Sequence, residues 1–222
     1  MAKETAGAPS LKAENGKAIW LLVSADIAAI ALVLTGFVFT QASLSELAQS
    51  AFIRDLLFAA VGPLVAVFLN DLLPSNAKAS IVFWPFKDAL PGHRAFSVHA
   101  EADPRIDMAV LKKEMGEFPQ SPRDQNTCWY RLYQKHKSNV IISDSHKRFL
   151  LFRDSSSLTL LILVIVSMAA ALSGVPLSQQ AVIVGGLAVQ FLWLAVSSRN
   201  TGIRLVQNVL ALESSDDGWK KK

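Results

Sequence analysis

The chain has 222 residues, of which 51% are hydrophobic and 18% are charged, and its formal net charge is +4. Its one cysteine, Cys128, excludes an internal disulfide framework and an all-cysteine zinc site within one chain. A net charge this small does not indicate nucleic-acid binding, and no other feature gives direct support for a nucleic-acid partner. The apolar residues come in long blocks, which favours a protein of the lipid bilayer over a soluble globular domain.

Residues 1–17 are polar and lack apolar periodicity, so we expect a disordered cytoplasmic tail. The first apolar block, residues 18–40, would span about 34 Å as a helix, enough for a hydrocarbon core of about 30 Å. Its apolar region is longer than that of a cleaved signal peptide, usually about 7–15 residues. We therefore predict a first transmembrane helix.

The second block, residues 51–73, is less apolar. Its uninterrupted part, residues 56–69, would reach only about 21 Å as a helix, and Asp55 and Asp71 flank it. Gly62-Pro63 predicts a kink in its middle. We predict a second transmembrane helix here, and a re-entrant or interfacial helix is the alternative.

Two further blocks, residues 158–175 and 181–197, just reach membrane length and are separated by a short uncharged turn. We expect an antiparallel hairpin. Residues 201–213 continue with apolar side chains at helical spacing, so 198–222 should form a cytoplasmic helix and tail.

Apart from Arg54 near the start of the second block, lysine and arginine lie in the two tails and in the segment between the second and third blocks. By the positive-inside rule these parts face the cytoplasm. The predicted fold is a membrane all-α protein with four transmembrane helices in two hairpins, 18–73 and 158–197. A cytoplasmic domain, 74–157, is inserted between the second and third helices. The expected location is the cell inner membrane, with both termini cytoplasmic.

The cytoplasmic domain, 84 residues with 13 Lys or Arg and 9 Asp or Glu, can hold one modest core. Residues 80–86 and 95–101 read as short strands. Asp103, Ser121 and either Asp144 or Ser145 are candidate N-caps of three helices. We therefore expect an α+β or a mainly helical module.

Three runs carry a resemblance: WPFKDALPGHRAFSVHAEADPRID, QNTCWYRLYQKH, and HKRFLLFRD before an apolar helix. They resemble a group of uncharacterised bacterial inner-membrane proteins, over about two-thirds of the chain. The resemblance implies that location and no activity, so no site residue is transferred from it. The plan of several membrane helices with a small cytosolic module is also loosely similar to membrane effectors of anti-phage defence systems.

A basic and aromatic group in the cytoplasmic domain is the candidate ligand site. Its cations could hold a phosphate-bearing ligand such as a nucleotide, or anionic headgroups, and its aromatic rings could stack on a base. An ordinary positive-inside signal and a core aromatic stripe are the simpler interpretations. The group consists of Trp129, Arg131, Tyr133, Lys135, His136, His146, Lys147 and Arg148.

A second group contains possible metal ligands. Two histidines and two carboxylates could hold zinc or manganese, but their spacing matches no metal motif, and the helix-cap interpretation of Asp103 competes. The group is His93, His99, Asp103 and Asp107. No cofactor is expected.

Asp26 lies about 13 Å into the first apolar block, where an ionised carboxylate costs about 2.5–3.5 kcal/mol. Such a residue usually faces other helices or a cavity. Ion or proton conduction is one interpretation, and a hydrogen bond to another helix is the other.

The sequence contains no Walker loop, GxGxxG, GxSxG or HExxH motif, which favours a role other than catalysis. The first hypothesis is a membrane protein whose cytoplasmic domain senses a ligand or protein partner and whose helices self-associate as a homo-oligomer, forming a pore or disrupting the membrane. The alternatives are a membrane-tethered enzyme acting on a phosphorylated or lipid substrate, and a structural subunit of a larger membrane complex.

Overall fold

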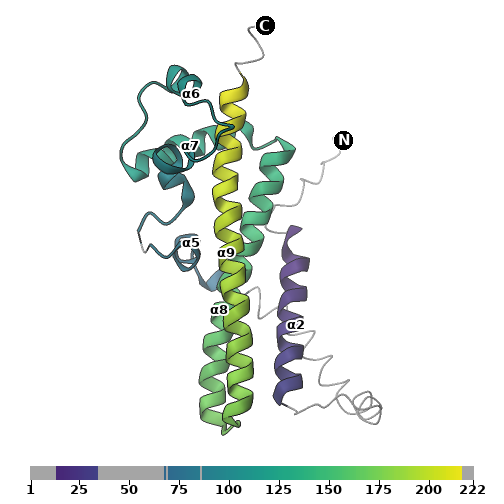
Figure 1. Ribbon diagram of the computed structural model, residues 1–222. Helices are drawn as coiled ribbons and strands as arrows, with labels where there is room; N and C mark the ends of the chain where they lie inside the picture. Colours follow the sequence, from purple (N-terminus) through teal and green to yellow (C-terminus); the bar gives the residue numbers. More distant parts are fainter. Residues whose placement is uncertain (1–13, 35–67, 69, 86, 217–222) are drawn as a thin grey trace, which may run out of the picture. The chain divides into compact units, whose positions relative to one another are not determined.

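The computed structural model describes residues 14–34, 68, 70–85 and 87–216, and this part of the chain contains helices and no strand. Three helices in it are long and apolar enough to cross a membrane. They are α2 (Gly16–Leu34), α8 (Val140–Ser173) and α9 (Leu177–Asp216), shown in Figure 1. The membrane character predicted from the sequence is therefore confirmed. The second predicted span lies mostly outside the described residues.

The chain divides into two compact units. One, here called the span unit, comprises Gly16–Pro74 and Asp154–Leu194. The other, the polar module, comprises Met1–Asn15, Ser75–Arg153 and Ala195–Lys222. Both α8 and α9 are uninterrupted helices that contribute residues to each unit.

A tight turn joins α8 to α9 in the span unit. Gly174 has a φ of 70°, a left-handed conformation that glycine adopts without steric cost. The Pro176 carbonyl accepts hydrogen bonds from the backbone N–H groups of Gln179 and Gln180 at 3.0 and 3.1 Å. The Gln180 side chain donates to the Val175 carbonyl at 2.7 Å. Because these contacts satisfy the first turn of the helix, α9 begins at Leu177, four residues before the predicted start.

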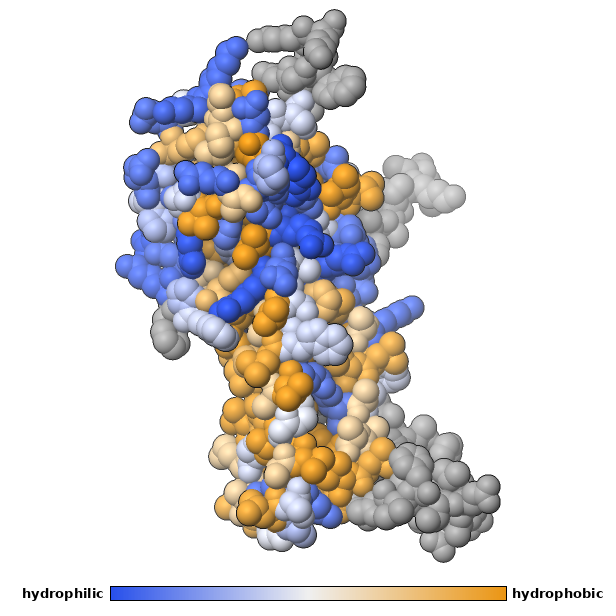
Figure 2. All heavy atoms as spheres, in the orientation of Figure 1, coloured by the Kyte–Doolittle hydropathy of each residue, from blue (hydrophilic) through white to orange (hydrophobic). Residues whose placement is uncertain are grey.

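The outer surface of the span unit is apolar, as a surface in contact with lipid should be. Leu172, Trp193 and Val189 are 87%, 74% and 68% exposed. Figure 2 shows hydrophobic residues covering the part of α8 and α9 near their connecting turn, and mainly hydrophilic residues over the polar module.

Five short helices belong to the polar module. The predicted strands are wrong, because residues 80–83 lie in a helix and residues 95–99 form a π-helix. A strand needs a neighbouring strand for its hydrogen bonds, whereas these segments satisfy their N–H groups locally. The helices are α5 (Ser75–Phe83), the 3-10 helix η2 (Pro91–Arg94), the π-helix η3 (Ala95–His99), α6 (Met108–Met115) and α7 (Pro122–His136).

One side chain explains the turn at η3. Gln125, buried on α7, accepts hydrogen bonds at 3.2 Å from the backbone N–H groups of Phe96 and Ser97. It also accepts one from the Ser97 hydroxyl at 3.1 Å. Gln125 therefore satisfies donors that a helix start leaves unpaired, and it fastens η3 to α7.

The structure confirms one of the three predicted N-cap positions and differs from the prediction at the other two. Ser121 caps α7 as predicted, accepting from the Asp124 N–H at 3.2 Å. The cap of α6 is Asp107, not Asp103, because Asp103 forms an ion pair with Arg105. In α8 the cap position moves upstream of Asp144 and Ser145. There the Asn139 side chain accepts from the Ile141 N–H at 2.9 Å.

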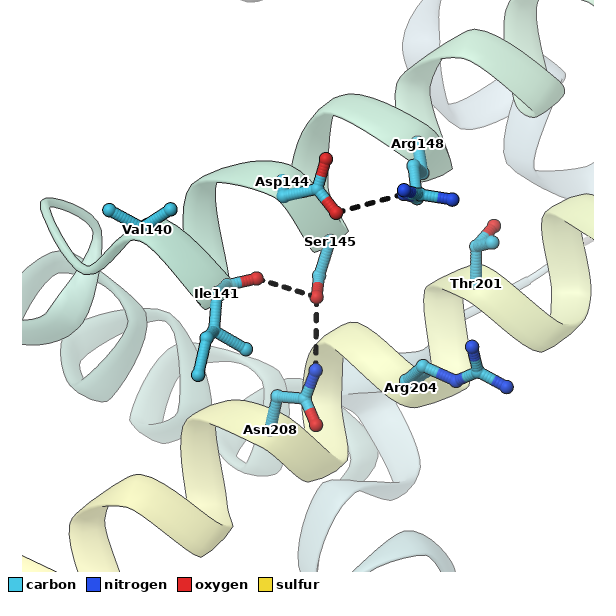
Figure 3. Close-up of a pocket in the computed structure, with 8 residues that line it drawn as sticks. All are labelled: Val140, Ile141, Asp144, Ser145, Arg148, Thr201, Arg204 and Asn208. Carbon is cyan, nitrogen blue, oxygen red and sulfur yellow. Dashed lines mark hydrogen bonds and ion pairs between the residues drawn. The ribbon is translucent and has the colours of Figure 1, made fainter.

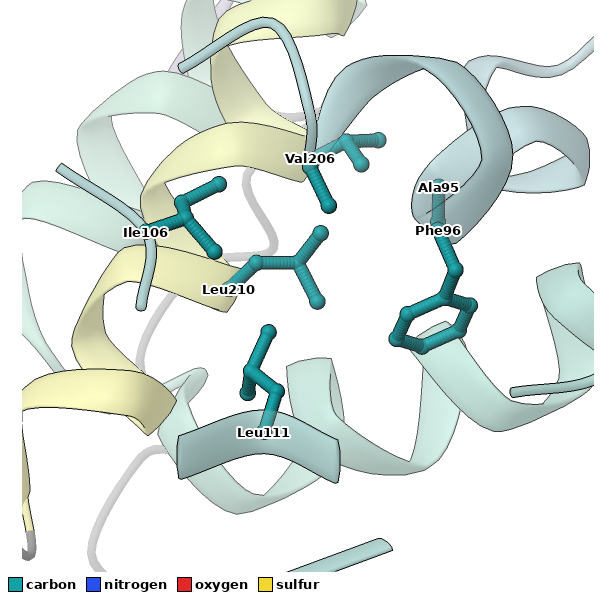
Figure 4. Close-up of a cluster of buried hydrophobic side chains, with 7 residues drawn as sticks. Ala95, Phe96, Ile106, Leu111, Val206 and Leu210 are labelled. Atoms are coloured by element: carbon teal, nitrogen blue, oxygen red, sulfur yellow. The ribbon is translucent and has the colours of Figure 1, made fainter. Parts of the chain in front are cut away.

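The cores of the polar module form on α9. Phe96, Ile106 and Leu111 pack against Val206 and Leu210 of α9, as Figure 4 shows. A second cluster joins Ile142 and Phe149 of α8 to Leu205 and Val209 of α9. The last part of α9 is therefore the central helix of the module.

Candidate functional site

Lys135 and His136, both in the predicted ligand group, bind a carboxylate of their own chain. The Lys135 ammonium donates to both Glu213 oxygens at 2.8 and 3.0 Å, and His136 Nε2 contacts Glu213 Oε2. Glu213 and His136 are buried. Burial alone would raise the pKa of the Glu213 carboxyl, but the hydrogen bonds and charges of Lys135 and His136 lower it. This cluster fastens the end of α7 to the end of α9.

His146 also has a structural partner. Its Nδ1 lies 2.7 Å from the Tyr133 hydroxyl, and the two rings meet edge to face. Burial and the nearby Arg153 charge lower the pKa of His146, and burial raises the pKa of Tyr133. Trp129 stacks on Tyr133 and packs against both cores. The aromatic stripe is therefore part of the packing of α7.

The remaining three cations of the group lie apart from this packing. Lys147 donates to Glu14 at 2.7 Å, and Arg148 donates to Asp144 at 2.8 Å. The exposed Arg131 side chain forms no hydrogen bond or ion pair within the described part of the chain. The structure therefore does not gather the eight residues into one site, although Arg148 lines the cleft described below.

The four predicted metal ligands each have a separate structural role. His93 Nδ1 lies 3.1 Å from the Leu90 carbonyl oxygen. His99 is buried at the end of η3, and burial and Arg94 lower its pKa. Asp103 pairs with Arg105, and Asp107 caps α6. Across the described ranges, no three His, Cys, Asp or Glu side chains form a group that could hold a metal ion.

A cleft between α8 and α9 in the polar module is the candidate functional site. Its cavity volume is about 480 Å³, within the range of about 300–1,000 Å³ typical of ligand pockets. From α8 it is lined by Val140, Ile141, Asp144, Ser145 and Arg148. From α9 it is lined by Thr201, Arg204 and Asn208, as Figure 3 shows.

Buried polar side chains hold the floor of this cleft in place. Asn208 donates to the Ser145 hydroxyl at 2.9 Å, and Ser145 donates to the Ile141 carbonyl at 2.7 Å. On its other side, Asn208 accepts from the Arg105 guanidinium at 3.1 Å. Arg105 in turn forms a two-pronged pair with the buried Asp103, which lowers the pKa of that carboxyl. The chain of contacts fixes the spacing of α8 and α9.

The two ends of the cleft differ in polarity. In Figure 3, Arg148, Thr201 and Arg204 gather at one end, and Val140 and Ile141 lie toward the other. Val140 and Ile141 are 81% and 64% exposed, so the apolar end of the cleft is open to solvent. The lining offers two guanidiniums, one carboxylate, one amide and two hydroxyls. Polar groups of this kind beside apolar side chains are typical of a ligand-binding site.

Asp26 is paired with another helix of the span unit. Gln190 of α9 donates from its amide to the two Asp26 oxygens at 2.9 and 3.1 Å, and lies 3.4 Å from the Thr159 hydroxyl of α8. The carboxylate is 5% exposed. This geometry matches the hydrogen-bonded interpretation of Asp26 and joins three helices through one amide.

The residues of these sites that were not identified from the sequence include Gln190, Arg204, Asn208 and Glu213. Gln190 had a detectable signal, because it is a polar side chain within an apolar block. Glu213 and Asn208 had none, since their partners are 77 and 63 positions away along the chain. Arg204 could be read only as one more positive residue near the membrane.

Replacing the buried carboxyl tests the cluster at the end of α9. Glu213→Gln should lower stability by about 1–2 kcal/mol at neutral pH, or the melting temperature by about 2–8 °C. Because the pKa of Glu213 is lower in the folded chain, its ionisation stabilises the fold above the ordinary value of 4.5, and this contribution is lost as the pH falls through the folded value. Melting curves should show a constant difference from about pH 7 to about pH 5, and a difference that shrinks as the pH falls below 4.5 toward the folded pKa.

Glu117→Gln is the matched control, because the Glu117 side chain is 91% exposed and lies 3.9 Å from Lys112. It should melt like the wild type across this pH range. A difference between wild type and Glu213→Gln that stays constant as the pH falls below 4.5 would contradict the role assigned to the carboxylate.

The helix contact at Asp26 predicts a second stability effect. Gln190→Leu removes the amide donor and should destabilise the chain in nanodiscs by about 0.5–2 kcal/mol, measured by thermal unfolding. Asp26→Asn should cost less, because an asparagine oxygen still accepts from Gln190. Met168→Leu, at a 63% exposed position of α8, is the control. Equal stability of Gln190→Leu and this control would rule out a stabilising contact.

Comparisons with known proteins assign no family: no family model, no curated protein and no solved structure matches the chain.

Proposed function

We propose that this chain is a multi-pass protein of a bacterial inner membrane that senses a ligand or partner through its polar module and self-associates through its membrane helices. Self-association would produce a pore or disrupt the bilayer. Four spans in two hairpins, with the polar module and both termini cytoplasmic, complete the proposal. The uncharged turn between α8 and α9 and the cationic polar module support this orientation.

One observation carries the proposal: the single helix α9 presents both a lining of the cleft and an exposed apolar stripe. In the span unit, Val182, Gly186, Val189 and Trp193 are all exposed. Their spacing of four, three and four residues places them on one helix face, as in the seam of a coiled coil. The same helix carries Thr201, Arg204 and Asn208 of the cleft.

The stripe is suited to helix association in a membrane. Lipid tails are as apolar as leucine, so helices associate where small residues permit close packing. A Cβ added at Gly185 or Gly186 would meet no atom within 4 Å in the described part of the chain. This supports a role for Gly185 and Gly186 in contacts with another chain.

The state of the titratable groups supports sensing rather than catalysis. Glu213, His136 and Lys135 bind one another, Tyr133 contacts His146, and Asp103 binds Arg105. A general acid or base must reach a substrate, and these groups are directed at protein partners.

The proposed sidedness predicts opposite labelling of two positions. Cys128→Ser removes the one native thiol, whose pKa is raised by burial. In that background, Lys113→Cys on α6 should react with a membrane-impermeant maleimide only in inside-out vesicles. Ser178→Cys, beside the turn between α8 and α9, should react only in intact spheroplasts. Labelling of Lys113→Cys in intact spheroplasts would overturn the orientation.

Self-association is tested by adding bulk to the stripe. We expect the wild type to have a defined oligomeric mass in native mass spectrometry, and Gly186→Leu to shift most of it to monomer. Ala169→Leu, which adds the same side chain at an exposed position of α8, should keep the wild-type mass. Melting temperatures of both variants verify that the protomer is folded.

A liposome leakage assay on the same three proteins tests the pore. Leakage of an encapsulated dye by wild type and Ala169→Leu, but not by Gly186→Leu, is the expected result. A wild-type monomer at every concentration would overturn self-association, and intact liposomes in the presence of a wild-type oligomer would overturn the pore.

A further inference from the structure

We infer that the cleft between α8 and α9 binds a small organic phosphate, with its phosphate at Arg148 and Arg204 and its apolar part on Val140 and Ile141. This inference rests on the proposed sensing function and specifies the ligand class of the same module. It is argued from charge, shape and rigidity of the cleft.

The cationic end has capacity for an anion. The exposed Arg204 side chain has no hydrogen-bond or ion-pair partner among the residues that the structure describes. Arg148 is paired with Asp144 four positions earlier on the same helix, and these side chains are 65% and 56% exposed. Exposed pairs of this kind contribute little, so an incoming dianion can compete with Asp144 for the Arg148 guanidinium.

Arginine geometry favours phosphate at this end. A guanidinium presents its donors in a planar fork that matches two phosphate oxygens. The two arginines come from different helices, so together they can contact different oxygens of one group. Thr201 lies beside them in Figure 3, but its hydroxyl donates to the Ser197 and Ser198 carbonyls, so it bounds the end of the cleft. A metal ion is disfavoured because Asp144 is the single carboxylate of the lining.

The other end requires more than a free phosphate. The cavity of about 480 Å³ is larger than an inorganic anion needs and is suited to an organic molecule. Val140 and Ile141 offer exposed apolar surface there, and burying it against a ring or chain is favourable. The floor formed by Ser145 and Asn208 is held by Arg105, so the cleft is formed before the ligand arrives.

Phenyl phosphate is the probe, because it combines a phosphate dianion with one apolar ring. The full chain in phosphatidylcholine nanodiscs should bind it by isothermal titration calorimetry. Inorganic phosphate, which lacks the ring, and phenol, which lacks the anion, should each bind at least about tenfold more weakly.

Three variants carry predicted effects of opposite sign. Arg204→Gln and Arg148→Gln should each weaken phenyl phosphate binding about tenfold, the loss of one charge-assisted contact. Asp144→Asn should strengthen binding about threefold, because it releases Arg148 and removes a repelling carboxylate. Arg131→Gln, an exposed arginine of α7 outside the cleft, should leave the affinity unchanged. All four positions are exposed, and melting curves verify that each variant folds.

Several outcomes overturn the inference. The proposed site is wrong if the folded wild type does not bind phenyl phosphate. It is also wrong if the wild type, Arg204→Gln and Arg148→Gln bind it with equal affinity. A lipid source is tested in nanodiscs containing phosphatidylglycerol. Full loss of phenyl phosphate binding in these nanodiscs, with binding kept in phosphatidylcholine, would assign Arg148 and Arg204 to lipid headgroups and overturn a soluble ligand.

The two proposals fail separately. If the wild type forms the Gly186-dependent oligomer but does not bind phenyl phosphate, this ligand class is wrong and self-association stands. If a monomeric wild type binds phenyl phosphate, and the arginine and Asp144 variants change the affinity as predicted, the ligand site is supported and self-association is wrong.

Discussion

The structure depends on how one helix keeps its apolar side chains away from water over 40 residues. A hydrocarbon core of about 30 Å covers only about 20 residues of a helix. The rest of α9 carries Leu205, Val206, Val209 and Leu210, which are 0–3% exposed because the short helices of the polar module pack around them. The module is thus a cover for the end of α9 as well as a separate unit. The polar module therefore depends on α9 as its central helix.

Buried ionic and polar groups fix the relative positions of the segments that pack in these apolar clusters. Taking a charge out of water costs several kcal/mol unless a partner compensates. Glu213 is compensated by Lys135 and His136, and Asp103 by Arg105. Glu213 joins α7 to α9, and Arg105, held by Asp103, contacts Asn208 of α9. These contacts fix positions that the apolar core alone would leave variable, because hydrophobic contacts are non-directional. The consequence is that Lys135, His136 and Arg105 bind groups of their own chain rather than a ligand.

The cleft and the proposed association surface both include residues of α9, so the proposed sensing and self-association would share one helix. A ligand changes a conformational equilibrium only when it binds one state more tightly than the other. Arg148 and Arg204 are on different helices, so a shared anion would favour the arrangement in which α8 and α9 hold both guanidiniums close. Because α9 is continuous into the span unit, a change in its pairing with α8 would also act on the helix that carries the proposed association surface.

The sequence by itself determined the membrane character, the long apolar helices and the cap at Ser121, because block hydrophobicity and capping act over a few neighbouring residues. It also identified Asp26 as a polar residue needing a partner. Only the tertiary structure decided that this partner is Gln190, that Lys135 and His136 serve Glu213, and that residues 80–83 and 95–99 are helical. These outcomes depend on contacts between distant segments, and the cost of burying an unpaired polar group, rather than local propensity, selects among them.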